Sequence, residues 1–319
     1  MSTESGLGPG AGGLGTGTGG LGTGAGGSSR TGVIHDIGYR RYTGERSGLG
    51  GIVGSLLWSG VLALFGFGRS GKAKALPFAL LAVTLVPAVI QVGIMAFMGL
   101  SSELLNYSSY ISGSSFLVVM FVAAQAPVLF SRDLRSGVIS LYLARPVGAT
   151  VFALTRWASL VLGILAFVLT PILVIFIGGV AAGASFTEEL PRAGVALAGA
   201  VLLALLVATV AALITSWTLR RGLAIAGVIM VLLVGMGVTA ALQAVAVDAG
   251  QERPAQWLAL LSPFVLVDSA QVSIGDARAG NYPAPADDAT TGWLLVLAAV
   301  ALMLLGLLLL VRRYRSKGA

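Results

Sequence analysis

The apolar positions of this chain form long uninterrupted runs, unlike the alternating or one-sided patterns of a soluble domain. Six runs are long enough to cross the hydrocarbon core of a bilayer, which is about 30 Å thick and takes about 20 helical residues. These runs lie at 76–100, 113–130, 157–183, 193–219, 222–247 and 292–311. None of them contains Asp, Glu, Lys, Arg or His. The pattern predicts an all-α integral membrane protein with six transmembrane helices.

Composition supports this class. Hydrophobic residues make up 56% of the chain and charged residues 10%, with a mean hydropathy of +0.92. A soluble domain carries about 25% charged residues, so a soluble globular fold is excluded. The chain has no cysteine, which excludes disulfides and thiolate metal sites.

A seventh apolar run, 51–68, contains several glycines as well as Ser55, Ser59 and Trp58, and basic residues flank it on both sides. The positive-inside rule decides its placement. If 51–68 lies on the cytoplasmic surface and both termini are cytoplasmic, the chain's 20 Lys and Arg residues fall almost entirely inside. The exceptions on the outer side are Arg192, Arg253 and Arg278. If 51–68 crossed the membrane, many basic residues would lie outside. We therefore expect an N-terminal interfacial helix.

The chain divides into three regions on this basis. Residues 1–29 are a Gly-rich low-complexity segment, which we expect to be a disordered cytoplasmic tail. Residues 30–75 form a cytoplasmic leader with the interfacial helix, and 76–315 form the six-span transmembrane domain. A charged cytoplasmic insert, 131–156, separates the second and third spans, and an external loop, 248–291, separates the last two.

The external loop contains an apolar stretch, 256–267, that is too short to cross and is interrupted by Pro263. Its length is typical of a re-entrant or interfacial segment. Four aspartates follow this stretch, and their spacing differs from that of a calcium-binding loop. We expect a solvated acidic face from Asp268, Asp276, Asp287 and Asp288.

No motif indicates an enzyme or a bound cofactor. Residues 66–73 nearly match a phosphate-binding P-loop, but Ala73 replaces the hydroxyl that coordinates Mg²⁺ and no strand precedes it. His35 is the single histidine, so a multi-histidine metal site is excluded. We expect no catalytic, metal or cofactor site, and no nucleic-acid partner, because the basic residues flank membrane spans.

The strongly polar residues of the predicted spans are Gln91, Gln125 and Gln243. Ion-coupled carriers usually place ionisable groups inside their spans, and these spans have none. The glutamines either form interhelical hydrogen bonds or line a translocation path.

The insert, which with the first residue of the third span reads SRDLRSGVISLYLARPVGATVFALTRW, is predicted to contain a short amphipathic helix at 131–145. Leu134, Val138, Leu141 and Tyr142 are spaced as one apolar face of a helix, and Pro146 ends the pattern. Such a helix either lies on the membrane surface, where basic residues bind anionic lipid, or docks on a soluble partner.

The insert resembles that of the membrane subunits of ABC-2 type transporters, particularly an actinobacterial form. The similar sequences are SRDLRSG at 131–137, LYLARPV at 141–147 and GVIHDIGYRRYTG at 32–44. The resemblance implies a plasma-membrane permease with an interfacial helix, six spans and a cytoplasmic coupling helix. It also implies a homodimer or heterodimer of permease subunits, export as the direction of transport, and ATP bound by a separate ATP-binding subunit.

On this resemblance, the helix at 131–145 seats in a cleft of the ATP-binding subunit. The implied polar contacts are Arg132, Asp133, Arg135 and Arg145, and the implied apolar anchors are Leu134 and Tyr142. Two other functions compete with this one. The chain either works alone as a secondary carrier or channel, or serves as a membrane scaffold or sensor regulator without transport.

Sidedness tests the interfacial helix. Because the chain has no cysteine, Gly48→Cys and Ser70→Cys each introduce a single label site. We expect a membrane-impermeant maleimide to label both in inverted vesicles and neither in right-side-out vesicles. Labelling of the two positions from opposite sides would mean that 51–68 crosses the membrane.

Overall fold

The computed structural model describes residues 48–68, 70–98, 107–131, 148–218, 220–275 and 282–318. The chain divides into two units, Met1–Glu45 and Arg46–Ala319, and all of the described residues lie in the second. Within the described residues every regular element is helical and no strand occurs.

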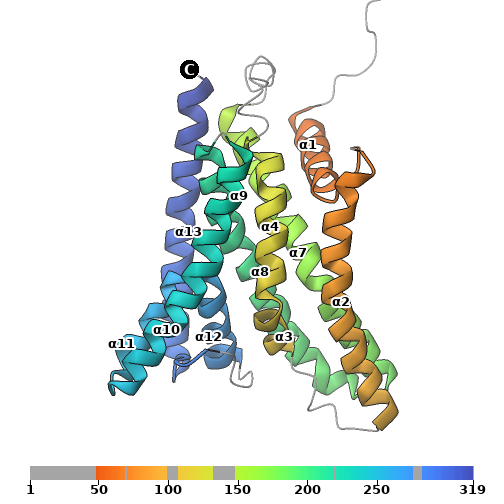
Figure 1. Cartoon of the computed structure of the whole chain (residues 1–319), viewed down its shortest axis with the longest axis vertical. Coiled ribbons are helices and arrows are strands. Elements are labelled where there is room, and N and C mark those ends of the chain that lie inside the picture. The colour runs from red at the N-terminus through yellow and green to blue at the C-terminus, as the bar shows by residue number, and fades with distance from the viewer. Residues whose placement is uncertain are drawn as a thin grey trace, which may run out of the picture. The chain divides into compact units, whose positions relative to one another are not determined.

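The N-terminal half of this unit contains α1 (Leu49–Leu64), α2 (Lys72–Met98), α3 (Tyr107–Gly113), α4 (Ser115–Leu129) and α7 (Ala149–Ala181). The C-terminal half contains α8 (Phe186–Trp217), α9 (Arg221–Ile229), the π-helical turn η2 (Met230–Val234), α10 (Gly235–Asp248), α11 (Glu252–Trp257), the 3₁₀ turn η3 (Leu258–Leu261), α12 (Pro263–Gly275) and α13 (Ala289–Gly318). Figure 1 shows the long helices running side by side in alternating directions.

Five stretches are long and apolar enough to span a membrane, which agrees with the predicted class of all-α membrane protein. They are α2, α7, α8, the continuous α9–η2–α10 segment and α13. The sixth predicted span, 113–130, corresponds to α3 and α4, which are bent by 53° relative to each other. The bend lies at Ser114, beside Gly113, where Gly and Ser residues commonly kink helices. The described residues therefore contain five straight candidates and one bent candidate.

Helix α1 overlaps the predicted interfacial run, 51–68, begins two residues before it and is shorter than a span. Its 16 residues extend about 24 Å at the helical rise of about 1.5 Å per residue, which is less than the roughly 30 Å of hydrocarbon. Its exposed side carries Ser55, Ser59 and Trp58. An exposed indole beside small polar residues is typical of a helix at the membrane–water boundary.

The other side of α1 packs closely on α7. Gly60 is buried there, and a Cβ at this position would lie 2.4 Å from the Oγ of Ser159. That hydroxyl also hydrogen-bonds the carbonyl of Leu57, at 3.2 Å. One turn further, Leu64 is fully buried and occupies the space that a side chain at Gly163 would need. The α1–α7 contact depends on small residues that let the two backbones approach.

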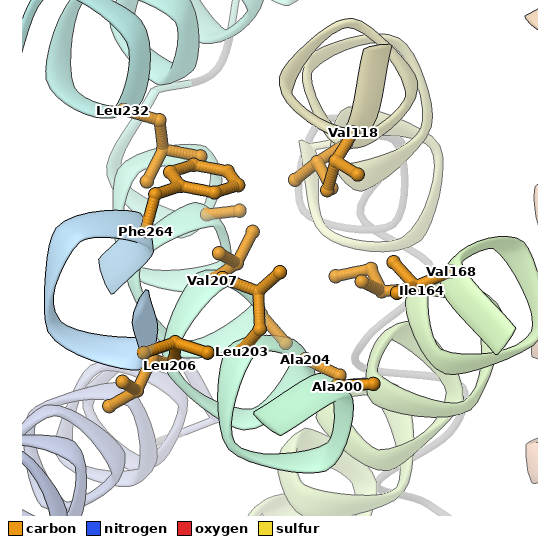
Figure 2. Close-up of a cluster of buried hydrophobic side chains, with 14 of the residues drawn as sticks. Val118, Ile164, Val168, Ala200, Leu203, Ala204, Leu206, Val207, Leu232 and Phe264 are labelled. Atoms are coloured by element: carbon orange, nitrogen blue, oxygen red, sulfur yellow. The ribbon is translucent and has the colours of Figure 1, made fainter. Parts of the chain in front are cut away.

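Helices α7 and α8 form the centre of the fold. They pack against each other, α7 also contacts α1, α2 and α13, and α8 also contacts α4, α12 and α13. Every fourth residue along one stripe of α8 is a fully buried alanine: Ala196, Ala200, Ala204, Ala208 and Ala212. Figure 2 shows Ala200 and Ala204 facing Ile164 and Val168 of α7. Small residues at such an interface allow the close packing that holds helices together in lipid.

Replacing Gly60 by Leu tests the α1–α7 contact. We expect a loss of about 1–3 kcal/mol of stability from overpacking against Ser159, measured as a lower melting temperature in detergent. Gly54→Leu is the matched control, because a Cβ there meets nothing within 4 Å. Both changes gain the same helix propensity, so equal melting temperatures would contradict the close packing.

Candidate functional site

The charges of the described residues separate between the two ends of the helix bundle. Helices α2, α7 and α9 begin, and α4, α8 and α13 end, at one end of the bundle, where α1 also lies (Figure 1). We call this the basic end. Its basic residues are Lys72, Lys74, Arg156, Arg220, Arg221, Arg312, Arg313 and Arg315. The helix termini at this end contain no acidic residue in the part of the chain that the structure describes.

The opposite end, which we call the acidic end, holds all of the acidic residues that the structure describes. They are Glu188, Glu189, Asp248, Glu252, Asp268, Asp287 and Asp288. Arg192 and Arg253 are the described basic residues there. This separation is the one expected when the basic end faces the cytoplasm.

At the basic end, arginines connect three helices. The Nε of Arg315 on α13 donates a hydrogen bond to Oγ1 of Thr150 on α7, at 3.0 Å. The guanidinium of Arg313 lies over the ring of Trp217 on α8, 5.9 Å from its centroid. On α7 itself, the guanidinium of Arg156 lies over the Phe152 ring, at 5.2 Å. These contacts hold the ends of α7, α8 and α13 together.

The insert begins and ends at the basic end. Its predicted docking residues, which are Arg132, Asp133, Leu134, Arg135, Tyr142 and Arg145, lie outside the described residues. Its first residue, Ser131, is buried, and its Oγ lies 2.9 Å from the carbonyl of Thr215 and 3.0 Å from that of Thr218. Its last residue, Arg156, is also buried. Both edges of the insert are therefore fixed to the helix bundle.

The three predicted glutamines differ in their surroundings. Gln243 on α10 is fully buried and its Nε2 donates to the carbonyls of Ala255, at 3.1 Å, and Ala284, at 3.2 Å. These bonds join α10 to α11 and to the segment before α13, so this side chain holds the outer segments together. Gln125 is buried on α4, and Gln91 on α2 is half-buried.

Two carboxylates near the acidic end are buried, a feature that the sequence analysis did not predict for either of them. Glu189 on α8 is 0% exposed and accepts hydrogen bonds from the hydroxyl of Tyr107 and from Nη1 of Arg192, both at 2.8 Å. Asp268 on α12 is 2% exposed and accepts a hydrogen bond from the hydroxyl of Ser112, at 2.5 Å. Two of these three donors, Tyr107 and Ser112, belong to the short helix α3.

The expectation of a solvated acidic face at Asp268 is therefore wrong. Helix α12 packs against α3, α8 and α13, which covers Asp268 on several sides. Asp287 accepts a hydrogen bond from Nε2 of Gln256, at 2.5 Å. Asp288 is exposed and caps α13 by accepting from the N–H of Thr291. Hydrogen bonding, first from the Thr291 side chain and then from the backbone N–H of Thr291, lowers the pKa of its carboxyl. Asp276 lies outside the described residues.

Polar bonds hold α3 on three sides. Tyr107 reaches α8 and Ser112 reaches α12, as described above, and the hydroxyl of Tyr110 donates to the carbonyl of Thr84 on α2. Beyond α12, burial and the charge of Asp268 raise the pKa of Tyr282 to about 12. We call the cluster of Tyr107, Ser112, Glu189 and Asp268 the outer clamp. It joins the bent second span to α8 and α12.

An apolar cavity of about 280 Å³ lies beside the outer clamp, between α8, α12 and α13. Gly199 and Gly275 line it, together with Gln271 and Trp293. The arrangement has no group of three His, Cys, Asp or Glu side chains suited to a metal ion among the described residues. The described interactions of the outer clamp and the cavity walls are packing contacts and hydrogen bonds.

Comparison with known proteins returns no family model and no curated protein that matches this chain. A functional interpretation of this chain therefore has to start from its own geometry. The two features used for it are the anchored edges of the insert and the outer clamp.

Glu189→Ala tests the outer clamp. It leaves the buried Tyr107 hydroxyl without its acceptor, so we expect a loss of about 1–3 kcal/mol of stability, seen as a lower melting temperature. The neighbouring Glu188 is exposed, and Glu188→Ala should change stability by less than about 0.5 kcal/mol. Equal effects of the two changes would show that the clamp contributes nothing.

Proposed function

We propose that this chain is the membrane-spanning permease subunit of an ABC-2 type ATP-driven exporter. In this proposal a separate ATP-binding subunit docks on the helix at 131–145 and drives the spans between inward-facing and outward-facing states. The permease pairs with a second permease subunit, both termini lie in the cytoplasm, and the assembly resides in the plasma membrane. The direction of transport and the ATP-binding partner follow from the resemblance of the insert.

One observation carries the proposal: the insert is anchored at both edges at the basic end of the bundle. Ser131 bonds to the last turn of α8, and α7 follows the insert directly from Ala149 onward. A force applied at these two edges would act directly on α7 and α8. Those two helices are the centre of the packing, so their displacement would move the other spans as well.

The distribution of charge favours an external energy source. Ionisable side chains inside spans are costly and mark ion-coupled or proton-coupled carriers. In the described spans such side chains lie within a few turns of the helix ends, as with Arg156 on α7 and Glu189 on α8. An ion gradient has no carboxylate in the middle of a described span to act on, which supports ATP hydrolysis by a partner over a stand-alone carrier.

In the proposed transport cycle, the outer clamp would transmit helix movements at the acidic end of the bundle. Movement of α8 would be transmitted through Glu189 to Tyr107, and movement of α12 through Asp268 to Ser112. Both lead to α3, which is joined to α4 at the 53° bend. The clamp thus couples α8 and α12 to the entrance of the second span, where an exporter must open outward.

Co-purification with its partner tests the proposal. We expect the full-length protein, affinity-purified from its native membranes, to retain a P-loop ATPase with measurable ATP hydrolysis. Leu134→Asp should reduce the retained ATPase at least about tenfold, because an unpaired carboxylate in an apolar seat costs more than about 1.4 kcal/mol. Arg135→Glu should weaken retention in the same direction.

Arg253→Glu is the matched control for charge reversal, since Arg253 is exposed near the acidic end, and it should leave retention unchanged. If the complex survives both changes in the insert, the docking helix is assigned wrongly. If no P-loop ATPase is retained by the unaltered protein, the transporter proposal fails, and a stand-alone carrier or a scaffold becomes the better explanation.

A further inference from the structure

A groove of about 720 Å³ lies between the start of α7 and the end of α13. From α13 it is lined by Leu304, Leu307, Leu308, Val311, Arg312 and Arg315. These positions follow the i, i+3, i+4, i+7, i+8, i+11 spacing of one helical face. Thr150 and Leu154 of α7, one turn apart, form the opposite wall. The groove thus has an apolar floor along the helices and a basic mouth at their ends.

The length and polarity of the groove match those of one phospholipid molecule in a bilayer leaflet. From Leu304 to Arg312 the helix rises about 12 Å at about 1.5 Å per residue, which carries the floor from the mouth well into the hydrocarbon. Leu304 and Leu308 are 53% and 67% exposed, so an acyl chain can contact them directly. At the mouth, the Nε of Arg315 is held by the Thr150 hydroxyl, which fixes the guanidinium over the groove.

The positive charge at the mouth of the groove favours a lipid with an anionic headgroup. Arg312 and Arg315 are both exposed, and all charged side chains of the described helix ends around them are basic. Basic pockets between transmembrane helices on the cytoplasmic side bind anionic headgroups, and arginine pairs well with phosphate oxygens. We propose that this groove is a binding site for an anionic phospholipid, with an acyl chain along the leucines and the phosphate between Arg312 and Arg315.

The site has a consequence for the fold. A lipid seated here would contact α7 and α13 together, beside the Arg315–Thr150 bond, and would stabilise the joint between the first turns of α7 and the end of the chain. This proposal does not depend on the proposed transport function. It requires only that the basic end faces the leaflet that carries anionic lipid.

Native mass spectrometry of the purified full-length protein tests the site, with dioleoyl phosphatidylglycerol and dioleoyl phosphatidylcholine titrated into detergent micelles. We expect phosphatidylglycerol to bind more tightly, and Arg312→Gln/Arg315→Gln to weaken that binding about 30-fold, since each basic side chain near an anionic headgroup contributes about fivefold. Arg220→Gln/Arg221→Gln removes the same charge at the same end of the bundle but away from the groove, and should retain the binding.

A second variant keeps both arginines and the Arg315–Thr150 bond. Leu308→Trp fills the floor of the groove at an exposed position, and should weaken phosphatidylglycerol binding while leaving the melting temperature of the lipid-free protein unchanged. Inorganic phosphate should not displace the lipid, because it offers nothing to the leucines. Three results would each overturn the proposal: equal binding of the two lipids, an equal loss in the Arg220/Arg221 control, or unchanged binding in Leu308→Trp. The last would also be the result if a second copy of the chain covered the groove.

Discussion

The cost of an unpaired charge in hydrocarbon determines where the polar groups of this chain lie. A charged side chain at the centre of a membrane helix costs about 2.5–3.5 kcal/mol even by the lower estimates, which is a large part of the stability of a typical domain. Accordingly, the described acidic residues all lie at one end of the bundle, and the described basic residues other than Arg192 and Arg253 lie at the opposite end. The buried carboxylate of Glu189 is paired with the guanidinium of Arg192 and the hydroxyl of Tyr107.

This constraint leaves packing to hold the spans together. Lipid tails are as apolar as leucine, so the spans gain little from burying large side chains against one another. The chain instead uses small residues where helices meet, such as the alanines of α8 and the glycines Gly60 and Gly163 at the α1–α7 contact. Close packing joins α7 to α8, and the insert is anchored to this same pair. In the proposed cycle a docked partner moves these two helices together.

The five straight candidate spans and the separation of charge between the two ends of the bundle were predictable, because both follow from the order of apolar and charged residues along the chain. Extended runs without ionisable groups predicted α2, α7, α8, α9–α10 and α13. Basic residues indicated which helix ends lie together at one end of the bundle. The helices extend beyond the predicted spans, as α7 does from Ala149, because a helix continues past the hydrocarbon once its backbone bonds are formed.

The outer clamp could not be predicted in the same way. Tyr107 and Ser112 precede the apolar run at 113–130 and lie outside the predicted spans, whereas the structure places both in α3. Asp268 follows a short apolar stretch, and only the packing of α12 back onto α3 and α8 shows that it is buried. One signal was available, since apolar and amide residues continue on both sides of Asp268. The docking residues of the insert lie outside the described residues, so their role stays a prediction.

The most direct measurement is the labelling rate of Gly148→Cys, an exposed position of the insert immediately before α7. Inverted vesicles that contain the complete transporter would be labelled with an impermeant maleimide, with and without a non-hydrolysable ATP analogue. The account predicts that the analogue changes this rate, while vesicles that lack the ATP-binding partner show no change. An identical rate with and without the analogue in the complete transporter would contradict the coupling of this insert to ATP.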